Sequence, residues 1–338
     1  CRGLLMSAHH TAETGRHRRA AAPSGPGACP ESCPGARLRA MEVRFIEAPA
    51  LPRWLEPQFP FRRRMARVGE HAIHFVDEGE GGPAILLFHG NPTWSFLWRK
   101  VIHALAGEAR IIAPDLFGLG LSSKPRRPSA HTLEAHVETM HALVEALGVE
   151  SIVVAGQDWG GPVGMGVASR FHGTVAGLLI SNTAVLRPAR PFRPKPFHKF
   201  SHVPVVSDLA FRVGGFPLPV LHKVQGDPAS IGELERRAYR YPLRRVVDRA
   251  APLGLARMVP NAESHPSTPV LDRIGAWVES YEGPIELVWG TKDPILGKAL
   301  GRHARALPHA RVTETSAGHF LQEEVPDVLA AALARLLP

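Results

Sequence analysis

The stretch Ser151-Ile-Val-Val-Ala-Gly-Gln-Asp-Trp-Gly-Gly161 decides the fold of this 338-residue chain. An apolar, β-branched run ends at Gly156-Gln-Asp-Trp-Gly160, and a segment with helical spacing follows from Pro162 to Phe171. This is the pattern Gly-x-nucleophile-x-Gly of a nucleophile elbow, a sharp turn between a strand and a helix. The residue that such a strained turn lifts clear of the sheet is Asp158, and a carboxylate nucleophile forms an ester with an alkyl carbon. The same pattern also fits a tight turn with a capping aspartate, so the surrounding sequence has to discriminate between the two.

Apolar strand-like runs and amphipathic helical segments alternate on both sides of this stretch. A hairpin is expected within residues 65–77, turning at Gly69-Glu70. Further strands are expected at 84–88, 110–114, 177–181, 285–289 and 311–315, and helices at 98–106, 132–147, 298–307 and 325–337. This alternation predicts an α/β fold with a mostly parallel central sheet and helices on both of its faces.

Two segments depart from this alternation. Residues 185–265 are dense in proline and arginine, and we expect them to form a helical cap insertion over the carboxyl edge of the sheet, where ligands bind in such folds. The core then comprises residues 41–184 and 266–338. Residues 1–40 are rich in Ala, Arg, Gly and Pro, which predicts a disordered tail. Because Met41 opens the first patterned segment, we interpret this tail as a translation-start or fragment artefact.

The net charge of +9 is regional. Residues 1–40 hold six arginines against two glutamates, and residues 185–265 hold fourteen Lys and Arg against six Asp and Glu. No basic motif is interleaved with aromatic residues as in nucleic-acid modules, and no apolar run reaches the roughly 20 residues of a membrane span. We therefore expect neither nucleic-acid binding nor a membrane span, and we interpret the basic insertion as a solvated face or a bias toward anionic ligands.

The cysteines also limit the chemistry. All three (Cys1, Cys29 and Cys33) lie in the first 33 residues. Neither disulfides nor thiol chemistry can therefore be central to the body of the protein, and no metal site is expected from the cysteines, because no further ligands cluster near them.

Four motifs together resemble a known family. They are His89-Gly-Asn-Pro-Thr-Trp-Ser-Phe-Leu-Trp98, Gly156-Gln-Asp-Trp-Gly-Gly161, Trp289-Gly-Thr-Lys-Asp293 and Ala317-Gly-His-Phe320. In this order, each after a relevant strand, they resemble the haloalkane dehalogenases of the α/β-hydrolase fold over roughly residues 41–338. The resemblance implies hydrolysis of haloalkanes to alcohol and halide through an aspartyl-ester intermediate, without a metal or an organic cofactor.

The resemblance implies a catalytic triad of Asp158, Asp293 and His319. In α/β-hydrolases the chain order is nucleophile, acid, then histidine. His319 lies in the loop between the last strand and the last helix, whereas His303 and His309 lie in or beside a helix and are expected at the surface. Asp293 follows the strand at 285–289, where it also fits a helix N-cap before Pro294. The alternative acid position of the family falls in residues 181–186, which contain no carboxylate.

A departing halide needs hydrogen-bond donors rather than a proton. Trp159 can offer its indole N–H and Asn91 its side-chain amide, although Asn91 also fits a turn residue ahead of Pro92. The insertion contains no tryptophan, so the resemblance points to the branch of the family with an Asn–Trp halide pair. The backbone N–H groups of the same two residues are expected to form the oxyanion hole.

Three alternatives stay open. The Asn–Trp branch also resembles β-lactone decarboxylases of olefin synthesis, in which aromatic residues of the insertion could cover an acyl chain. We instead expect these phenylalanines to form the insertion's own core; they are Phe192, Phe197, Phe200, Phe211 and Phe216. Epoxide hydrolases use two cap tyrosines, but Tyr239 and Tyr241 would point to opposite faces of a helix. The third alternative is a ligand-binding receptor on the same fold.

The sequence therefore predicts a haloalkane dehalogenase that acts on a small apolar substrate. We expect a monomer or weak oligomer, located in the cytoplasm, that interacts with no nucleic acid.

Overall fold

The computed structural model describes residues 41–188 and 196–338. The predicted tail of residues 1–40 and Phe192 lie outside the described residues. Within the described part, nine strands form one sheet in the order β1-β2-β3-β5-β4-β6-β7-β8-β9. The strands are β1 (Val43–Ile46), β2 (Arg63–Val68), β3 (His71–Glu78), β4 (Ala84–Phe88), β5 (Ile111–Pro114), β6 (Ser151–Gln157), β7 (Thr174–Ser181), β8 (Ile285–Gly290) and β9 (Arg311–Thr315).

The sheet is mostly parallel, as the alternation of strands and helices predicted. Strands β1, β2, β3 and β5 pair antiparallel in succession, and all pairs from β5 to β9 are parallel. The predicted hairpin is confirmed, with Val68 opposite His71 across the turn at Gly69-Glu70. The parallel strands β4 and β8 are buried along their whole length, as is typical of strands covered on both faces.

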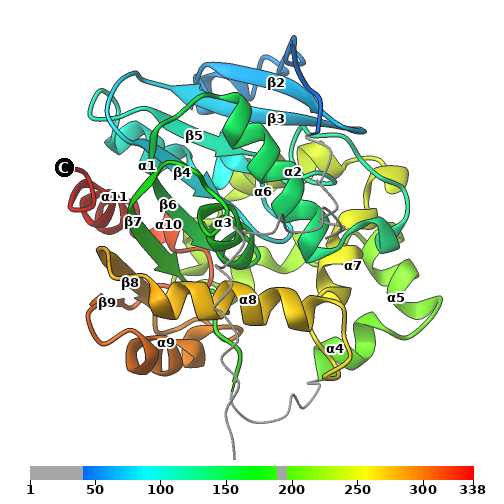
Figure 1. Cartoon of the computed structure of the whole chain (residues 1–338). Coiled ribbons are helices and arrows are strands. Elements are labelled where there is room, and N and C mark those ends of the chain that lie inside the picture. The colour runs from blue at the N-terminus through cyan, green and yellow to red at the C-terminus, as the bar shows by residue number, and fades with distance from the viewer. Residues whose placement is uncertain (1–40, 189–195) are drawn as a thin grey trace, which may run out of the picture. The chain divides into compact units, whose positions relative to one another are not determined.

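Helices cover both faces of the sheet. Helices α2 (Leu133–Ala146), α3 (Gly160–Ala168) and α8 (Ser267–Ser280) pack together on one face, and α1 (Arg99–Ala104), α10 (Leu321–Glu324) and α11 (Pro326–Ala334) pack on the other (Figure 1). Helix α9 (Leu300–Ala306) contacts β8. Helix α2 begins as its sequence predicts, because the Thr132 hydroxyl accepts a hydrogen bond from Ala135 N and caps the first turn.

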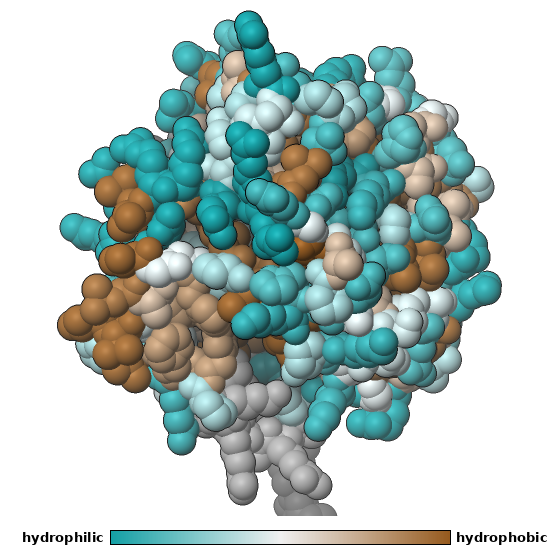
Figure 2. Space-filling view, turned by 180° about the vertical axis from the view of Figure 1, so that it is seen from behind, coloured by the Kyte–Doolittle hydropathy of each residue, from teal (hydrophilic) through white to brown (hydrophobic). Residues whose placement is uncertain are grey.

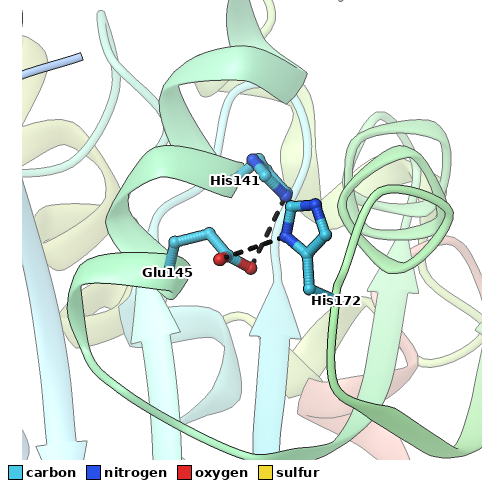
Figure 3. Close-up of side chains that lie close together, drawn as sticks. All are labelled: His141, Glu145 and His172. Atoms are coloured by element: carbon cyan, nitrogen blue, oxygen red, sulfur yellow. Dashed lines mark hydrogen bonds and ion pairs between the residues drawn. The ribbon is translucent and has the colours of Figure 1, made fainter. Parts of the chain in front are cut away.

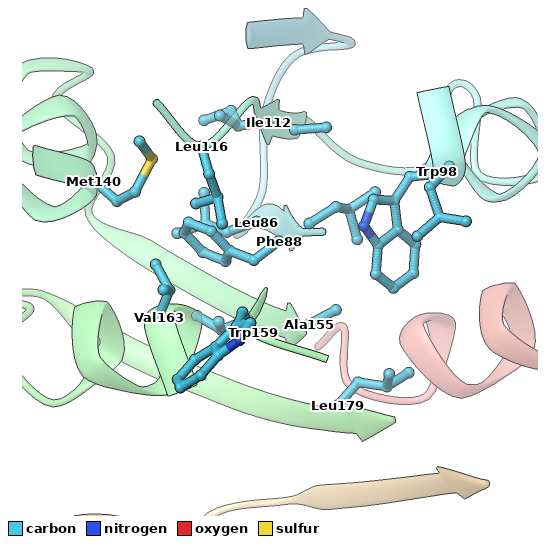
Figure 4. Close-up of a cluster of buried hydrophobic side chains, with 14 of the residues drawn as sticks. Leu86, Phe88, Trp98, Ile112, Leu116, Met140, Ala155, Trp159, Val163 and Leu179 are labelled. Atoms are coloured by element: carbon cyan, nitrogen blue, oxygen red, sulfur yellow. The ribbon is translucent and has the colours of Figure 1, made fainter. Parts of the chain in front are cut away.

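The apolar core fills both sides of the central strands. Figure 4 shows Met140 and Val163 on the side of α2 and α3, and Trp98 on the opposite side of β4 and β6. All three side chains are fully buried. Burying a large side chain contributes about 2–3 kcal/mol, so these two layers hold the parallel strands and the loops at their carboxyl ends in place.

Strand β1 and helix α8 are among the elements that were not predicted. Strand β1 adds one more antiparallel strand at the edge of the sheet. Helix α8 was missed although Val270, Leu271, Ile274 and Val278 are buried along one side of it. Their spacing is helical, but the proline-rich sequence just before them hid the pattern.

Between β7 and α8, the described residues of the segment 185–265 form a succession of short helices. The α-helices are α4 (Pro196–Ser201), α5 (Val206–Asp208), α6 (Glu233–Arg240) and α7 (Ala250–Arg257). Among the described residues, Phe211 packs with Leu253 and Ala256, and Phe200 and Phe216 pack against them. Phe197, 40% exposed, also lies beside Phe211. These described phenylalanines therefore contribute to the segment's own core, as predicted.

This inserted segment contacts the loops at the carboxyl ends of the parallel strands. The carbonyl oxygens of Pro252, Ala238 and Val224 accept hydrogen bonds from Asn91, Trp94 and His319, respectively. Within residues 41–188 and 196–338, no helix combines the length and the apolar character that a bilayer crossing needs.

Candidate active site

Asp158 lies at the apex of the turn between β6 and α3. Its φ of 51° is in the left-handed region, which is strained for a residue with a side chain. The turn is tight enough to require glycine on both sides, since a Cβ at Gly156 would overlap Gly160 O and a Cβ at Gly160 would overlap Phe88 O. Asp158 N donates to Asn182 O at 3.0 Å, which fixes the apex. The backbone therefore has the geometry of an elbow and presents the Asp158 carboxylate above the sheet.

Backbone N–H groups converge on this carboxylate. Asn91 N donates to Asp158 Oδ1 at 2.7 Å, and the backbone N–H of Trp159 is a second donor. Burial raises the pKa of Asp158, while His319 and these two N–H groups oppose that rise. Two donors aimed at one carboxylate can stabilise the carboxylate itself and also the oxyanion of a tetrahedral intermediate that forms at its carbon.

His319 and Asp293 lie next to this carboxylate. His319 Nδ1 is 2.9 Å from Asp293 Oδ2, and His319 Nε2 is 3.8 Å from Asp158 Oδ2. Burial alone would lower the pKa of His319, but the carboxylates of Asp293 and Asp158 outweigh it and raise that pKa. Burial would likewise raise the pKa of Asp293, but His319 and the backbone N–H of Ile295 are among the groups that lower it. The structure thus brings the three predicted residues together, in a geometry in which the imidazole can take up a proton beside Asp158.

Asn182 is a supporting residue that the sequence reasoning missed. Its amide nitrogen donates to Asp293 Oδ2 at 2.8 Å and to Gly318 O at 3.0 Å, and its amide oxygen accepts from Gly290 N at 2.8 Å. It is fully buried. Asn182 therefore ties together the loops that carry the acid and the histidine. The signal was available, because Asn182 follows the strand at which the family places its alternative acid.

Gln157 is a second residue without a predicted role. Its amide nitrogen donates to His319 O at 3.0 Å and lies 3.2 Å from His319 Nε2. Its amide oxygen is buried and has no partner among the described residues. A donor near Nε2 favours the tautomer with the proton on Nδ1, facing Asp293. Gln157 directly precedes Asp158 in the elbow motif, and this position could have identified it.

The two predicted halide ligands both adjoin Asp158, since Trp159 follows it in the chain and Asn91 N donates to its carboxylate. The Asn91 amide nitrogen donates one hydrogen to Pro252 O at 3.0 Å, which leaves its second N–H available. Trp159 is 8% exposed, and its indole nitrogen has no hydrogen-bond partner in the part of the chain that the structure describes. Both residues thus retain an N–H donor beside the carboxylate.

The cap tyrosines do not share a partner. Tyr239 is buried in α6 and its hydroxyl donates to Glu323 Oε1, whereas Tyr241 packs edge-on against Trp54. Glu323 in turn accepts from Arg99 at 2.6 and 2.9 Å. Tyr239 therefore belongs to a buried ion-pair network rather than to a pair of tyrosines that face one oxygen.

The prediction for one histidine was wrong. His303 was expected at the surface, but it is fully buried. Its Nδ1 bonds Ala299 O at 2.9 Å, Leu186 N donates to its Nε2 at 3.4 Å, and burial lowers its pKa to about 4. The side of helix α9 that carries His303 packs against β8 and Leu186. The helical spacing could not reveal this contact, because Leu186 is far away in the sequence. His309 is exposed, as expected.

A group able to bind a metal ion lies elsewhere. The side-chain donor atoms of His141, Glu145 and His172 lie within 4.8 Å of one another at the surface (Figure 3). They already pair among themselves, with His172 Nδ1 3.3 Å from Glu145 Oε2, and His141 Nε2 donates to Arg170 O at 2.9 Å. These ion pairs and hydrogen bonds hold the three side chains together, and within the described residues none of them contacts Asp158 or His319.

Comparisons with known proteins agree with this geometry. The family model of the α/β hydrolase fold matches residues 83–326. Haloalkane dehalogenase 2 of Mycobacterium tuberculosis is 35% identical over 303 residues, which are 87% of this chain and 98% of that protein. The cis-3-alkyl-4-alkyloxetan-2-one decarboxylase of Xanthomonas campestris is 31% identical over 284 residues, which are 79% of this chain and 92% of that protein.

A solved structure is similar as well. The crystal structure of haloalkane dehalogenase DbeA from Bradyrhizobium elkani superposes with a TM-score of 0.73 at 26% sequence identity. The alignment covers 81% of this chain and 97% of that one. The similarity therefore extends over almost the whole length of the relative.

Proposed function

Because this chain belongs to the haloalkane dehalogenase family of the α/β-hydrolase fold, we propose that it hydrolyses haloalkanes to an alcohol, a halide ion and a proton. The observation that carries the proposal is the strained Asp158 carboxylate with His319 3.8 Å away and Asp293 behind it. An aspartate in this position favours displacement at carbon over acyl transfer.

In the first step, Asp158 attacks the halogen-bearing carbon. A C–O bond forms, the carbon–halogen bond breaks, and the halide leaves with the bonding electron pair. The free N–H of the Asn91 side chain and the indole N–H of Trp159 donate to the departing halide. Because the halide needs no proton, no general acid is required in this step.

In the second step, His319 Nε2 takes a proton from water, and the hydroxide attacks the Asp158 carboxyl carbon. The oxyanion of the tetrahedral intermediate accepts from the backbone N–H groups of Asn91 and Trp159, which already converge on this carboxylate. Asp293 stabilises the imidazolium that forms. The bond between the carboxyl carbon and the alkyl oxygen then breaks, and the alkoxide takes the proton of the added hydroxyl and leaves as the alcohol. Asp158 is again a carboxylate, and His319 releases its proton to solvent.

Residues 185–265 are the cap in this proposal, and residues 41–184 and 266–338 are the catalytic core. The hydrogen bond from Asn91 to Pro252 supports this division, because it joins the halide-binding loop to α7 of the insertion. A small apolar substrate suits the site, since Trp159 and its surroundings are mostly apolar. We expect a monomer or weak oligomer, located in the cytoplasm; both stay predictions.

A second candidate function is decarboxylation of a β-lactone to an alkene and carbon dioxide. The 31% identity to the Xanthomonas oxetan-2-one decarboxylase over 92% of its length favours it. Epoxide hydrolysis is disfavoured, because the Tyr239 hydroxyl is committed to Glu323. A receptor on this fold would bind a ligand without turnover.

The test is intact mass spectrometry of the variant His319→Phe after exposure to 1-bromohexane. Without its base the second step stalls while the first proceeds, so the protein gains one hexyl group on Asp158. The matched control is the double variant Asp158→Asn/His319→Phe, which should gain none. A folded His319→Phe protein without an adduct contradicts dehalogenation, and conversion of a β-lactone to alkene by the unmodified protein would then support the second candidate.

A further inference from the structure

Four arginines line one hollow on the inserted segment. The hollow has a volume of about 420 Å³ and is lined by residues of α6, by Tyr241 of η7 (Tyr241–Leu243), by Arg244 and by Trp54. Its cationic residues are Arg236, Arg237, Arg240 and Arg244, and Glu233 is the one carboxylate in its lining. Four positive charges against one negative charge leave this hollow strongly cationic.

Neutral groups hold three of these four arginines in place. The Arg237 guanidinium lies 4.0 Å from the centre of the Trp54 ring, and that of Arg244 lies 4.4 Å from the centre of the Tyr241 ring. Arg236 donates to Ile231 O at 3.2 Å. Aromatic rings and carbonyl oxygens orient a guanidinium without neutralising its charge. No ion pair between these four arginines and a carboxylate is found in the described part of the chain, so their charge stays available to an anion.

An apolar surface adjoins this hollow. Arg240 also lines a second hollow of about 320 Å³, together with Val213 and Leu218. Val213 ends η4 (Leu209–Val213), and this stretch is unusually exposed: Val205 is 68%, Leu209 56% and Val213 59% exposed. Figure 2 shows a brown cluster on the side of the molecule where α4 and α5 lie after the half-turn. The cationic hollow and the aliphatic segment therefore form one continuous surface.

We propose that this surface is a docking site for a bilayer of anionic phospholipids. Guanidinium groups bind phosphate in a bidentate manner, and exposed aliphatic side chains insert at the boundary between headgroups and acyl chains. An exposed apolar patch of this kind marks an interaction site rather than an ordinary surface. The fourteen Lys and Arg against six Asp and Glu of residues 185–265 complement a negatively charged membrane. The role is independent of the dehalogenase proposal, because none of these residues contacts Asp158 or His319.

The test is co-sedimentation of the full chain with vesicles of phosphatidylcholine, with and without phosphatidylglycerol. We expect binding only to vesicles that contain phosphatidylglycerol, with weaker binding as salt rises above about 0.15 M. Replacing Arg237, Arg240 and Arg244 by alanine should weaken partitioning by about a hundredfold, since each basic residue near an anionic surface contributes about fivefold. Leu209→Asp should weaken it by about tenfold or more, because it places a charge where the aliphatic side chain inserts.

The matched control replaces Arg44, Arg305 and Arg311 by alanine. These arginines are exposed, lie outside residues 185–265 and form no side-chain hydrogen bond or ion pair within the described chain. Both triple variants lose three positive charges, so the net charge changes equally. The control should retain vesicle binding, and all variants should retain bromide release from 1-bromohexane. An equal loss in the control would mean that only net charge matters and would overturn the proposal. Binding of inorganic pyrophosphate without vesicle binding would also overturn it, in favour of a free phosphate ligand.

Discussion

The replacement Asn182→Ala tests how the catalytic loops are held together. It removes the donors to Asp293 Oδ2 and Gly318 O and the acceptor for Gly290 N, all within 3.0 Å of a fully buried side chain. An intramolecular hydrogen bond contributes about 1 kcal/mol, and a buried group left without a partner costs about 1–3 kcal/mol. One water molecule entering the vacated space would form some of the lost hydrogen bonds and recover part of the lost stability. The expected decrease in the free energy of unfolding is therefore about 3 kcal/mol.

Activity should fall in the same variant. Asp293 would still accept hydrogen bonds from His319 Nδ1 and from Ile295 N, so the Asp293–His319 pair is retained. The loop that carries His319, however, loses the hydrogen bond from Asn182 to Gly318 O. We expect about a tenfold lower kcat for bromide release, a modest effect compared with removing a catalytic group. Urea denaturation followed by tryptophan fluorescence and a halide-release assay measure the two quantities.

The matched control is Asn261→Ala. Asn261 is partly exposed and its side chain forms no hydrogen bond with the described residues, so its replacement should change stability by less than about 0.5 kcal/mol. A loss below about 1 kcal/mol for Asn182→Ala, with full bromide release, would refute the view that this amide ties the loops together.

Three further predictions follow from the structure. Gly90→Ala should abolish halide release in a folded protein, as circular dichroism and a halide assay would show, because the new Cβ would lie 2.8 Å from Asp158 Cγ and overlap Oδ1. The kcat should fall as the pH drops through the pKa of His319, which is raised above 6.5, because only the neutral imidazole can accept a proton. A kcat that stays constant from pH 5 to 9 would contradict the role of His319 as the base. Burial lowers the pKa of His131 to about 3, so between about pH 3 and 6.5 the unfolded state binds a proton that the folded state does not, and stability is lost as the pH falls below 6.5. His131→Leu should therefore reduce the slope of the unfolding free energy against pH in this range by about 1.4 kcal/mol per pH unit. An unchanged slope in urea titrations would contradict the lowered pKa of His131.

The sequence by itself determined the order of the main elements and the positions of Asp158, Asp293 and His319 at the ends of strands. These features are local: β-branched runs, helical spacing and glycines at a tight turn can each be recognised within about ten residues. The structure brings the three side chains together because parallel strands carry their following loops to the same edge of the sheet.

Only the tertiary structure decided how these residues are supported. Asn182 contacts Asp293, which is 111 residues away, and the Asn91 amide is engaged by Pro252, which is 161 residues away. The burial of His303 depends on packing against another element, and so does the orientation of Arg237 over the Trp54 ring. A hydrogen bond or a buried contact between two distant segments produces no periodic residue pattern in either segment, so it cannot be predicted from them. The physical reason is that local pattern specifies which way a side chain points, whereas its partner is fixed only when the sheet, helices and insertion pack together.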